Sequence, residues 1–122
     1  MRYMVIVKMA EDVGEAPQEL FEVMGREMGS MLASGKMRDA GGLGGTRESV
    51  EVRVRGGALS VTDGPYAEGK EVVGGFSIIE VDSHEEAVAN ARRVMEIHRE
   101  YWPGWEGSAE LRRIWEPEGT GQ

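Results

Sequence analysis

Residues 72–98 decide the fold, and they read VVGGFSIIEVDSHEEAVANARRVMEIH. The opening part, residues 72–82, is apolar on both of its alternating sides, which is typical of a strand in the middle of a sheet. The apolar positions are Phe76, Ile78, Ile79 and Val81. The stretch therefore predicts a central strand that leads straight into a helix.

The helix after this strand is predicted to begin at Ser83, because Ser83 and Glu86 have the spacing of a capping box. Apolar residues then recur at helical spacing along one stripe, and His98 lies on that stripe near the C-terminal end. The other members are Ala87, Val88, Ala91, Val94 and Met95. We expect an irregular segment, residues 101–105, to end the helix.

Toward the N-terminus, residues 3–9 form a second expected inner strand, since both of their alternating sides are largely apolar. A polar turn follows, and Pro17 occupies the position of a first helical residue. Apolar residues then recur at helical spacing until Gly35, which predicts an amphipathic helix. These residues are Leu20, Phe21, Met24, Met28, Met31 and Leu32.

Residues 50–62 predict a β-hairpin, because apolar residues alternate with polar ones on both sides of a Gly56-Gly57 pair. A two-residue turn at these glycines would keep one face of the hairpin apolar across both strands. In that register Val54 lies opposite Leu59, and Val52 lies opposite Val61.

Shorter segments complete the order of elements. A short strand is expected at residues 36–39, and the glycine-rich residues 41–45 favour a bend or a close backbone approach over a regular element. Residues 108–115 can supply the last strand, and the tail, residues 116–122, is expected to be loose. The residues that share one face of this last strand are Ala109, Leu111 and Trp115.

The resulting order predicts an α+β fold, a ferredoxin-like βαββαβ plan with an extra β-hairpin before the third core strand. One domain over residues 1–122 is expected, since no repeat or boundary interrupts the pattern. Two helices cover only one face of such a sheet, and the other face also carries apolar residues. We therefore expect a homodimer in which two open sheet faces pack together.

Charge and composition exclude several classes of partner and site. Fourteen Lys plus Arg against twenty-two Asp plus Glu give a net charge of -8, which makes nucleic acid an unfavourable partner. The chain has no cysteine and therefore no thiolate chemistry. The apolar N-terminal stretch is interrupted by Lys8 and is too short for a signal or a membrane span, so we expect a cytoplasmic protein without a membrane partner.

Residues 62–71, TDGPYAEGKE, are the most function-like stretch, because a loop between two strands gathers three carboxylates, a lysine and a phenol. We expect a small-molecule pocket here, with Gly64, Pro65, Tyr66 and Glu71 contacting the ligand. The competing interpretation is a plain turn, because Asp-Gly-Pro favours tight turns and charged residues commonly decorate them.

The motif DGPYAEGKE, followed by GGF at residues 74–76, closely resembles the DGPF motif of the YCII-related protein family. Supporting resemblance lies in residues 1–8, 41–43, 52–59, 81–83 and 98–113. The chain departs from the pattern at Tyr66, where the motif has phenylalanine, and at Gly44-Gly45, where relatives often have proline. The resemblance implies a dimeric α+β barrel, in which two ferredoxin-like sheets pack together and leave clefts.

Family resemblance also implies a His-Asp pair and cofactor-independent proton-transfer or elimination chemistry on an aromatic substrate. In this sequence the pair would be Asp63 with His98, since an imidazole can move protons and His98 lies on the inner stripe of its helix. A histidine on an apolar helical face is, however, more often a satisfied structural group than a catalyst. The alternative function is a non-enzymatic ligand-binding or regulatory accessory, associated with an extracytoplasmic-function sigma factor system.

Each of the other candidate residues has a structural interpretation as well as a functional one. Arg53 could clamp an anionic ligand beside Asp63, yet alternating charges on a hairpin are usually a solvated face. Trp102 and Trp105 could roof a cleft or simply cover the end of the core. The two histidines are far apart in the sequence, so we expect no metal site. The glycines lack the pattern of a nucleotide-binding loop, so we expect no cofactor.

Overall fold

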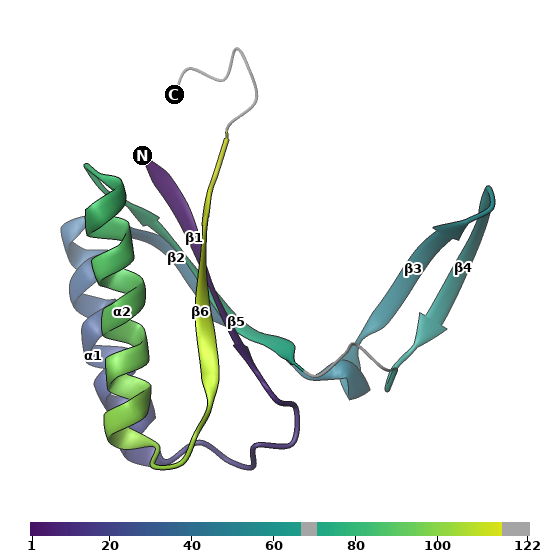
Figure 1. Cartoon of the computed structure of the whole chain (residues 1–122), viewed down its shortest axis with the longest axis horizontal. Helices are drawn as coiled ribbons and strands as arrows, with labels where there is room; N and C mark the ends of the chain where they lie inside the picture. Colours follow the sequence, from purple (N-terminus) through teal and green to yellow (C-terminus); the bar gives the residue numbers. More distant parts are fainter. Residues whose placement is uncertain (67–70, 116–122) are drawn as a thin grey trace.

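Two helices lie against one face of a four-stranded antiparallel sheet, and a two-stranded hairpin stands apart from it (Figure 1). The computed structural model describes residues 1–66 and 71–115. The sheet has the order β2-β5-β1-β6, and its strands are β1 (Arg2–Met9), β2 (Met37–Gly42), β5 (Val72–Glu80) and β6 (Gly107–Arg113). The other elements are α1 (Gln18–Ser34), α2 (His84–Tyr101), a 3-10 turn η1 (Thr46–Glu48), and the hairpin strands β3 (Val50–Arg55) and β4 (Ala58–Asp63). The predicted ferredoxin-like α+β fold with an extra hairpin is confirmed.

The main core lies between the middle strands and α2. Ile79 of β5 is fully buried and lies opposite Tyr3 of β1 and Met37 of β2. Ala87 and Ala91 of α2 pack against this cluster, and their small size lets the helix approach the sheet closely. The prediction of a central strand over residues 72–82 is confirmed, with the strand ending at Glu80.

The inner face of α2 differs from the predicted stripe at two positions. Val88 is 46% exposed although the stripe includes it, and Ile97, which the stripe omits, is 1% exposed. The helix is capped as expected at its start, where the Ser83 hydroxyl accepts a hydrogen bond of 3.1 Å from the Glu86 amide. The Glu86 carboxylate reaches back to the Asp82 amide, also at 3.1 Å.

The first helix packs less completely. Pro17 is the N-terminal cap rather than the first helical residue, and Gly35 ends the helix with φ +81°, a conformation that favours glycine. Leu20 and Val23 are buried, but Phe21 is 62% exposed, which the predicted stripe did not anticipate. Because α1 buries only part of its apolar side, the space beneath it is incompletely filled.

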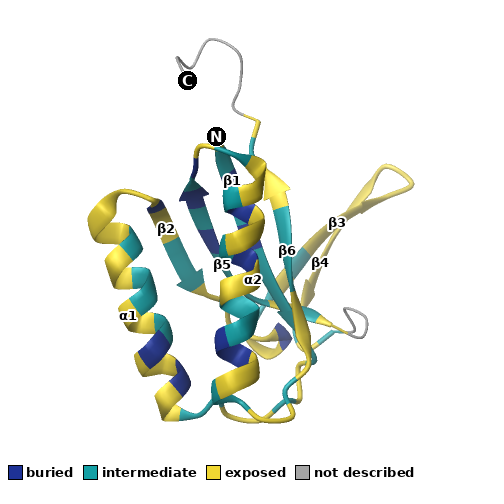
Figure 2. Ribbon diagram, turned by 60° about the vertical axis from the view of Figure 1, so that its left-hand side comes forward, coloured by how far each residue is buried: buried dark blue, intermediate teal, exposed yellow. Residues whose placement is uncertain are grey.

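The hairpin has the predicted register and turn. Val54 pairs with Leu59 and Val52 with Val61, and both turn glycines have positive φ, +57° at Gly56 and +80° at Gly57. The hairpin is exposed almost throughout its length, in contrast to the buried residues of the central strands and the inner sides of the helices (Figure 2).

The remaining segments need small corrections. The strand expected at residues 36–39 is longer, so Gly41 and Gly42 belong to β2 rather than to a bend. Glycine suits position 41, because a Cβ there would approach the Phe76 ring to 3.1 Å. Trp115 lies beyond β6 and is 76% exposed, with the Arg113 guanidinium 4.3 Å above its ring, so its predicted place on the strand is wrong. The tail, residues 116–122, lies outside the described residues.

Neither described helix is both long enough and apolar enough to cross a membrane.

Candidate functional site

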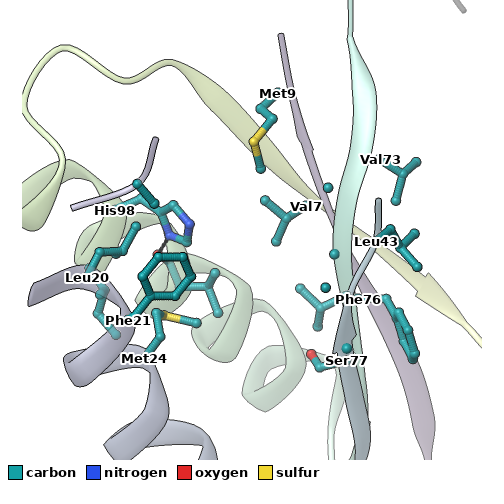
Figure 3. A pocket seen from close by; sticks show the side chains of 18 of the residues that line it. Val7, Met9, Leu20, Phe21, Met24, Leu43, Val73, Phe76, Ser77 and His98 are labelled. Carbon is teal, nitrogen blue, oxygen red and sulfur yellow. Dashed lines mark hydrogen bonds between the residues drawn. The ribbon is translucent and has the colours of Figure 1, made fainter. Parts of the chain in front are cut away.

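A cavity of about 650 Å³ lies between the helices and the sheet (Figure 3). Its walls come from the inner side of α1, the C-terminal half of α2 and the ends of β1, β2 and β5. The lining is mostly apolar, and methionines contribute an unusual share of it. They are Met9, Met24, Met28, Met31 and Met37.

Small residues explain why the cavity is not filled by the protein itself. Gly25 of α1 and Gly42 of β2 both line it, and a Cβ added to either would meet no atom within 4 Å. Gly75 lies opposite Val7 on the helix-covered side of the sheet, where a larger residue would occupy the space. Methionine side chains adapt their shape easily, so the lining can adjust to an occupant.

His98 is the titratable side chain most deeply set in this lining. It is 7% exposed, its ring centroid lies 4.6 Å from that of Trp105, and its Nδ1 lies 2.8 Å from the carbonyl oxygen of Val94. Since a carbonyl only accepts, Nδ1 carries the hydrogen and donates it. Among the described residues Nε2 has no hydrogen-bond partner, and the ring is directed into the cavity (Figure 3).

Two further polar side chains face the cavity without full hydrogen bonding. Ser77 of β5 is 8% exposed, its hydroxyl points into the cavity (Figure 3), and no described residue hydrogen-bonds to it. Asn90 of α2 donates from Nδ2 to the sulfur of Met31 at 3.2 Å, but its Oδ1 is buried without a described partner. A buried polar group without a partner costs about 1–3 kcal/mol. These groups are therefore suited to bonding an occupant of the cavity.

The cavity rim is held by polar contacts between elements. Arg93 of α2 and Glu27 of α1 form an ion pair of 2.9 Å, and the hydrogen bond from this pair raises the pKa of the Arg93 guanidinium. On the opposite side, the Glu11 carboxylate accepts hydrogen bonds from the amide and the hydroxyl of buried Thr46, at 2.6 and 2.9 Å. The hydrogen bonds between Glu11 and Thr46 fix the glycine-rich loop that borders the cavity.

The predicted Asp63 loop lies elsewhere. Asp63 ends β4 opposite Val50, its side chain is exposed, and it is not among the residues that line the cavity. The Gly64 amide donates to the carbonyl of Ser49 at 2.8 Å, and a Cβ at Gly64 would overlap the carbonyl oxygen of Thr46. The loop is thus anchored to η1, with a cis peptide bond between Gly64 and Pro65.

The structure does not bring the predicted site residues into one place. His98 lies in the cavity, whereas Asp63, Pro65, Tyr66 and Glu71 do not line it. Arg53 pairs with Glu51 on its own strand at 2.9 Å rather than with Asp63. Residues 67–70 of the motif lie outside the described residues. The roles of Asp63, Gly64, Pro65, Tyr66, Glu71 and Arg53 in binding or catalysis stay predictions.

Sequence reasoning missed Ser77 and Asn90. Ser77 is the polar residue in an otherwise apolar strand, and Asn90 interrupts the inner side of α2 beside Ala91. A polar residue at a predicted core position was the available signal in both cases, because such positions normally need a partner. Trp102 also lines the cavity near His98. This position is compatible with its interpretation as a residue that covers a cleft.

Comparison with known families gives one result for the chain. The model of the YCII-related domain matches residues 1–102, a span that includes the whole cavity and the Asp63 loop. Among curated proteins none matches the chain.

Proposed function

The chain belongs to the YCII-related family, and from this membership and its cavity we propose that it binds a small, largely apolar organic molecule between its helices and its sheet. The observation that carries the proposal is the combination of an apolar cavity of about 650 Å³ with three polar groups that lack full hydrogen bonding. Ligand sites are typically mostly apolar, 300–1,000 Å³ in volume, and marked by a few such polar groups.

The polar groups define the ligand further. His98 presents Nε2 as an acceptor when its ring is neutral, so the ligand needs a hydroxyl or another donor at that end. Ser77 can donate or accept, and Asn90 offers an acceptor. The rest of the lining is mostly apolar and offers the ligand no further hydrogen-bonding group. The nearby indole of Trp102 favours a flat or aromatic framework.

Proton transfer or elimination is the chemistry that this site could add to binding. His98 can act as the general base toward a weakly acidic group of the ligand, because Nε2 is the nitrogen left for the cavity. The resemblance of residues 63–71 to the DGPF motif supports the corresponding subgroup of the family and an Asp63 partner for His98. Within one chain Asp63 does not line the cavity, so the proposed chemistry rests on His98 as the base without Asp63.

A non-enzymatic ligand-binding protein is the second candidate. One observation favours it, namely that no described side chain is hydrogen-bonded to His98 Nε2 to exchange protons with it. Binding is common to both candidates. Turnover of an identified ligand, and its loss on changing His98, would separate them.

The experiment is a thermal-shift screen of phenols, aromatic acids and other flat amphiphiles, repeated with Val7→Phe. Val7 lines the cavity opposite Gly75, so the larger ring occupies the ligand space. The matched control is Val88→Phe, at an exposed position that does not line the cavity. We expect hits that raise the melting temperature of the wild type and of Val88→Phe but not of Val7→Phe. Hits that stabilise Val7→Phe equally would reject the cavity as the site.

A further inference from the structure

The cavity lies between two parts of the core that do not merge. One cluster of buried residues contains Val5 of β1 and Ala91 of α2, and a second contains Leu20 of α1 and Ile97 of α2. Val5 from the first cluster, and Leu20 and Ile97 from the second, also line the cavity. The cavity therefore extends from one cluster to the other and has two ends.

Two polar side chains lie at the end of the cavity next to the first cluster, which we call the serine end. Ser77 lies opposite Val5 in the sheet, and its hydroxyl has no described partner. Asn90 precedes Ala91 and donates to the sulfur of Met31, which packs against the same cluster, while its Oδ1 is buried without a described partner. The serine end therefore offers an occupant a hydroxyl group and an amide oxygen.

His98 is the polar side chain at the other end, which we call the histidine end. It follows Ile97 of the second cluster, and it lies on a different wall of the cavity from Ser77 (Figure 3). Asn90 precedes His98 by eight positions on α2, so a rise of about 1.5 Å per residue separates them by about 12 Å along the helix. Because helical side chains lean in one direction along the axis, their polar groups keep roughly this separation. Val94 and Ile97, which line the cavity between them, are apolar.

We propose that the ligand is an elongated molecule with a hydroxyl or another hydrogen-bond donor at each end and an apolar middle. This inference rests on the proposed binding function and adds the shape and the chemical class of the ligand. Nε2 of His98 and Oδ1 of Asn90 are both acceptors, so each end of the ligand has to donate. One aromatic ring with two hydroxyls is too short for a separation of about 12 Å, whereas two rings joined in line approach it.

The charged side chains of the lining favour neutral hydroxyls over anionic groups at the ends of the ligand. Arg93 is the only Lys or Arg among the described lining residues, and Glu27 already pairs with it at 2.9 Å. The Glu11 carboxylate also lines the cavity, where it accepts hydrogen bonds from Thr46. A carboxylate on the ligand would therefore meet a further carboxylate and no unpaired Lys or Arg, in a chain with a net charge of -8.

The test compares three compounds by isothermal titration. Dihydroxybiphenyl has a hydroxyl at the far end of each of its two rings, hydroxybiphenyl has only one of these hydroxyls, and hydroquinone has two hydroxyls on a single ring. We expect wild type to bind dihydroxybiphenyl at least about fivefold more tightly than hydroxybiphenyl, because the second hydroxyl adds a hydrogen bond at the serine end. Hydroquinone should bind more weakly than either. Val7→Phe, which fills the ligand space, should weaken the binding of all three.

Asn90→Leu and Ser77→Ala, two independent variants, each remove a polar group from the serine end. We expect both to lower the affinity for dihydroxybiphenyl about fivefold and to leave that for hydroxybiphenyl unchanged, since its single hydroxyl bonds His98. Ala89→Leu is the control, because Ala89 is exposed on α2 and does not line the cavity.

The outcomes separate this inference from the proposed function. A second hydroxyl that adds no affinity, while Val7→Phe still blocks both biphenyls, would overturn the two-ended ligand and leave the cavity as the binding site. Equal losses of both biphenyls in Asn90→Leu and Ser77→Ala, or no binding of dihydroxybiphenyl at all, would also overturn the two-ended ligand. Binding that Val7→Phe does not weaken would contradict the cavity as the site, and with it both proposals.

Discussion

The Nδ1 atom of His98 lies 2.8 Å from the carbonyl oxygen of Val94, one turn earlier in α2. The hydrogen bond fixes which ring nitrogen carries the hydrogen in the neutral state, because a carbonyl can only accept. Nε2 is left as an acceptor for whatever occupies the cavity. The geometry of one helix turn therefore sets the polarity that the ligand needs.

Replacing His98 by asparagine or by glutamine separates its two nitrogens. Asparagine can keep the bond to Val94 but has no atom at the place of Nε2, whereas glutamine is long enough to present an amide oxygen there. For a ligand found in the screen, we expect His98→Asn to weaken binding about tenfold and His98→Gln to retain most of it. Isothermal titration measures both. Equal losses would mean that Nε2 does not contact the ligand.

The Ser77 hydroxyl is expected to serve the ligand rather than the fold. Because it is buried without a described partner, Ser77→Ala should leave the free energy of unfolding unchanged or raise it by up to about 1 kcal/mol, while binding weakens. Urea unfolding checks the first part, with exposed Ser108→Ala as the control. A loss of stability above about 1 kcal/mol would show that the hydroxyl supports the ligand-free structure.

Elements whose structure depends on local chemistry could be predicted from the sequence. The hairpin register follows from Gly56-Gly57, since both glycines adopt the positive φ that a two-residue turn demands. The start of α2 follows from Ser83, whose side chain caps the helix as its pattern indicates. Such features depend only on neighbouring residues, so they can be predicted without knowledge of the tertiary packing.

Features that depend on how elements pack could not be predicted in this way. The exposure of Phe21 and Val88 and the burial of Ile97 depend on where each helix meets the sheet, which periodicity alone does not fix. Asp63 ends β4 and does not line the cavity that His98 lines, a separation that the sequence does not show, while the joint role of the two residues stays a prediction. The cavity itself arises from incomplete packing of α1, and the sequence shows this only through its glycines and methionines.

Gly64 is expected to be required for the loop that follows the hairpin. A Cβ at this position would overlap the carbonyl oxygen of Thr46, which is backbone and cannot move aside easily. Gly64→Ala should therefore lower the free energy of unfolding by about 2 kcal/mol or more. Gly42→Ala is the control, because its Cβ would meet no atom within 4 Å. Equal stability of the two variants would contradict the close approach.

Acid should weaken the ion pair at the edge of the open sheet face. The hydrogen bond from Arg2, with the charge of Arg38 nearby, holds the pKa of Glu80 below its ordinary value of 4.5. A carboxylate whose pKa is lowered by folding stabilises the native state above its ordinary pKa, and this stabilisation disappears as the pH falls through the lower, folded value. Wild type should therefore melt above Glu80→Gln at neutral pH, and the difference should shrink and then close as the pH falls below 4.5 through the lowered pKa of Glu80. A difference that is constant with pH would contradict the assignment.

Methionine methyl NMR tests the cavity as the ligand site most directly. Five methionines line the cavity, namely Met9, Met24, Met28, Met31 and Met37, while Met1, Met4 and Met95 do not. On titration with a ligand from the screen, the account predicts saturable shifts of the five cavity methyls, with the other three nearly unchanged. Shifts concentrated at Met1, Met4 or Met95, with the five cavity methyls unmoved at saturation, would contradict it.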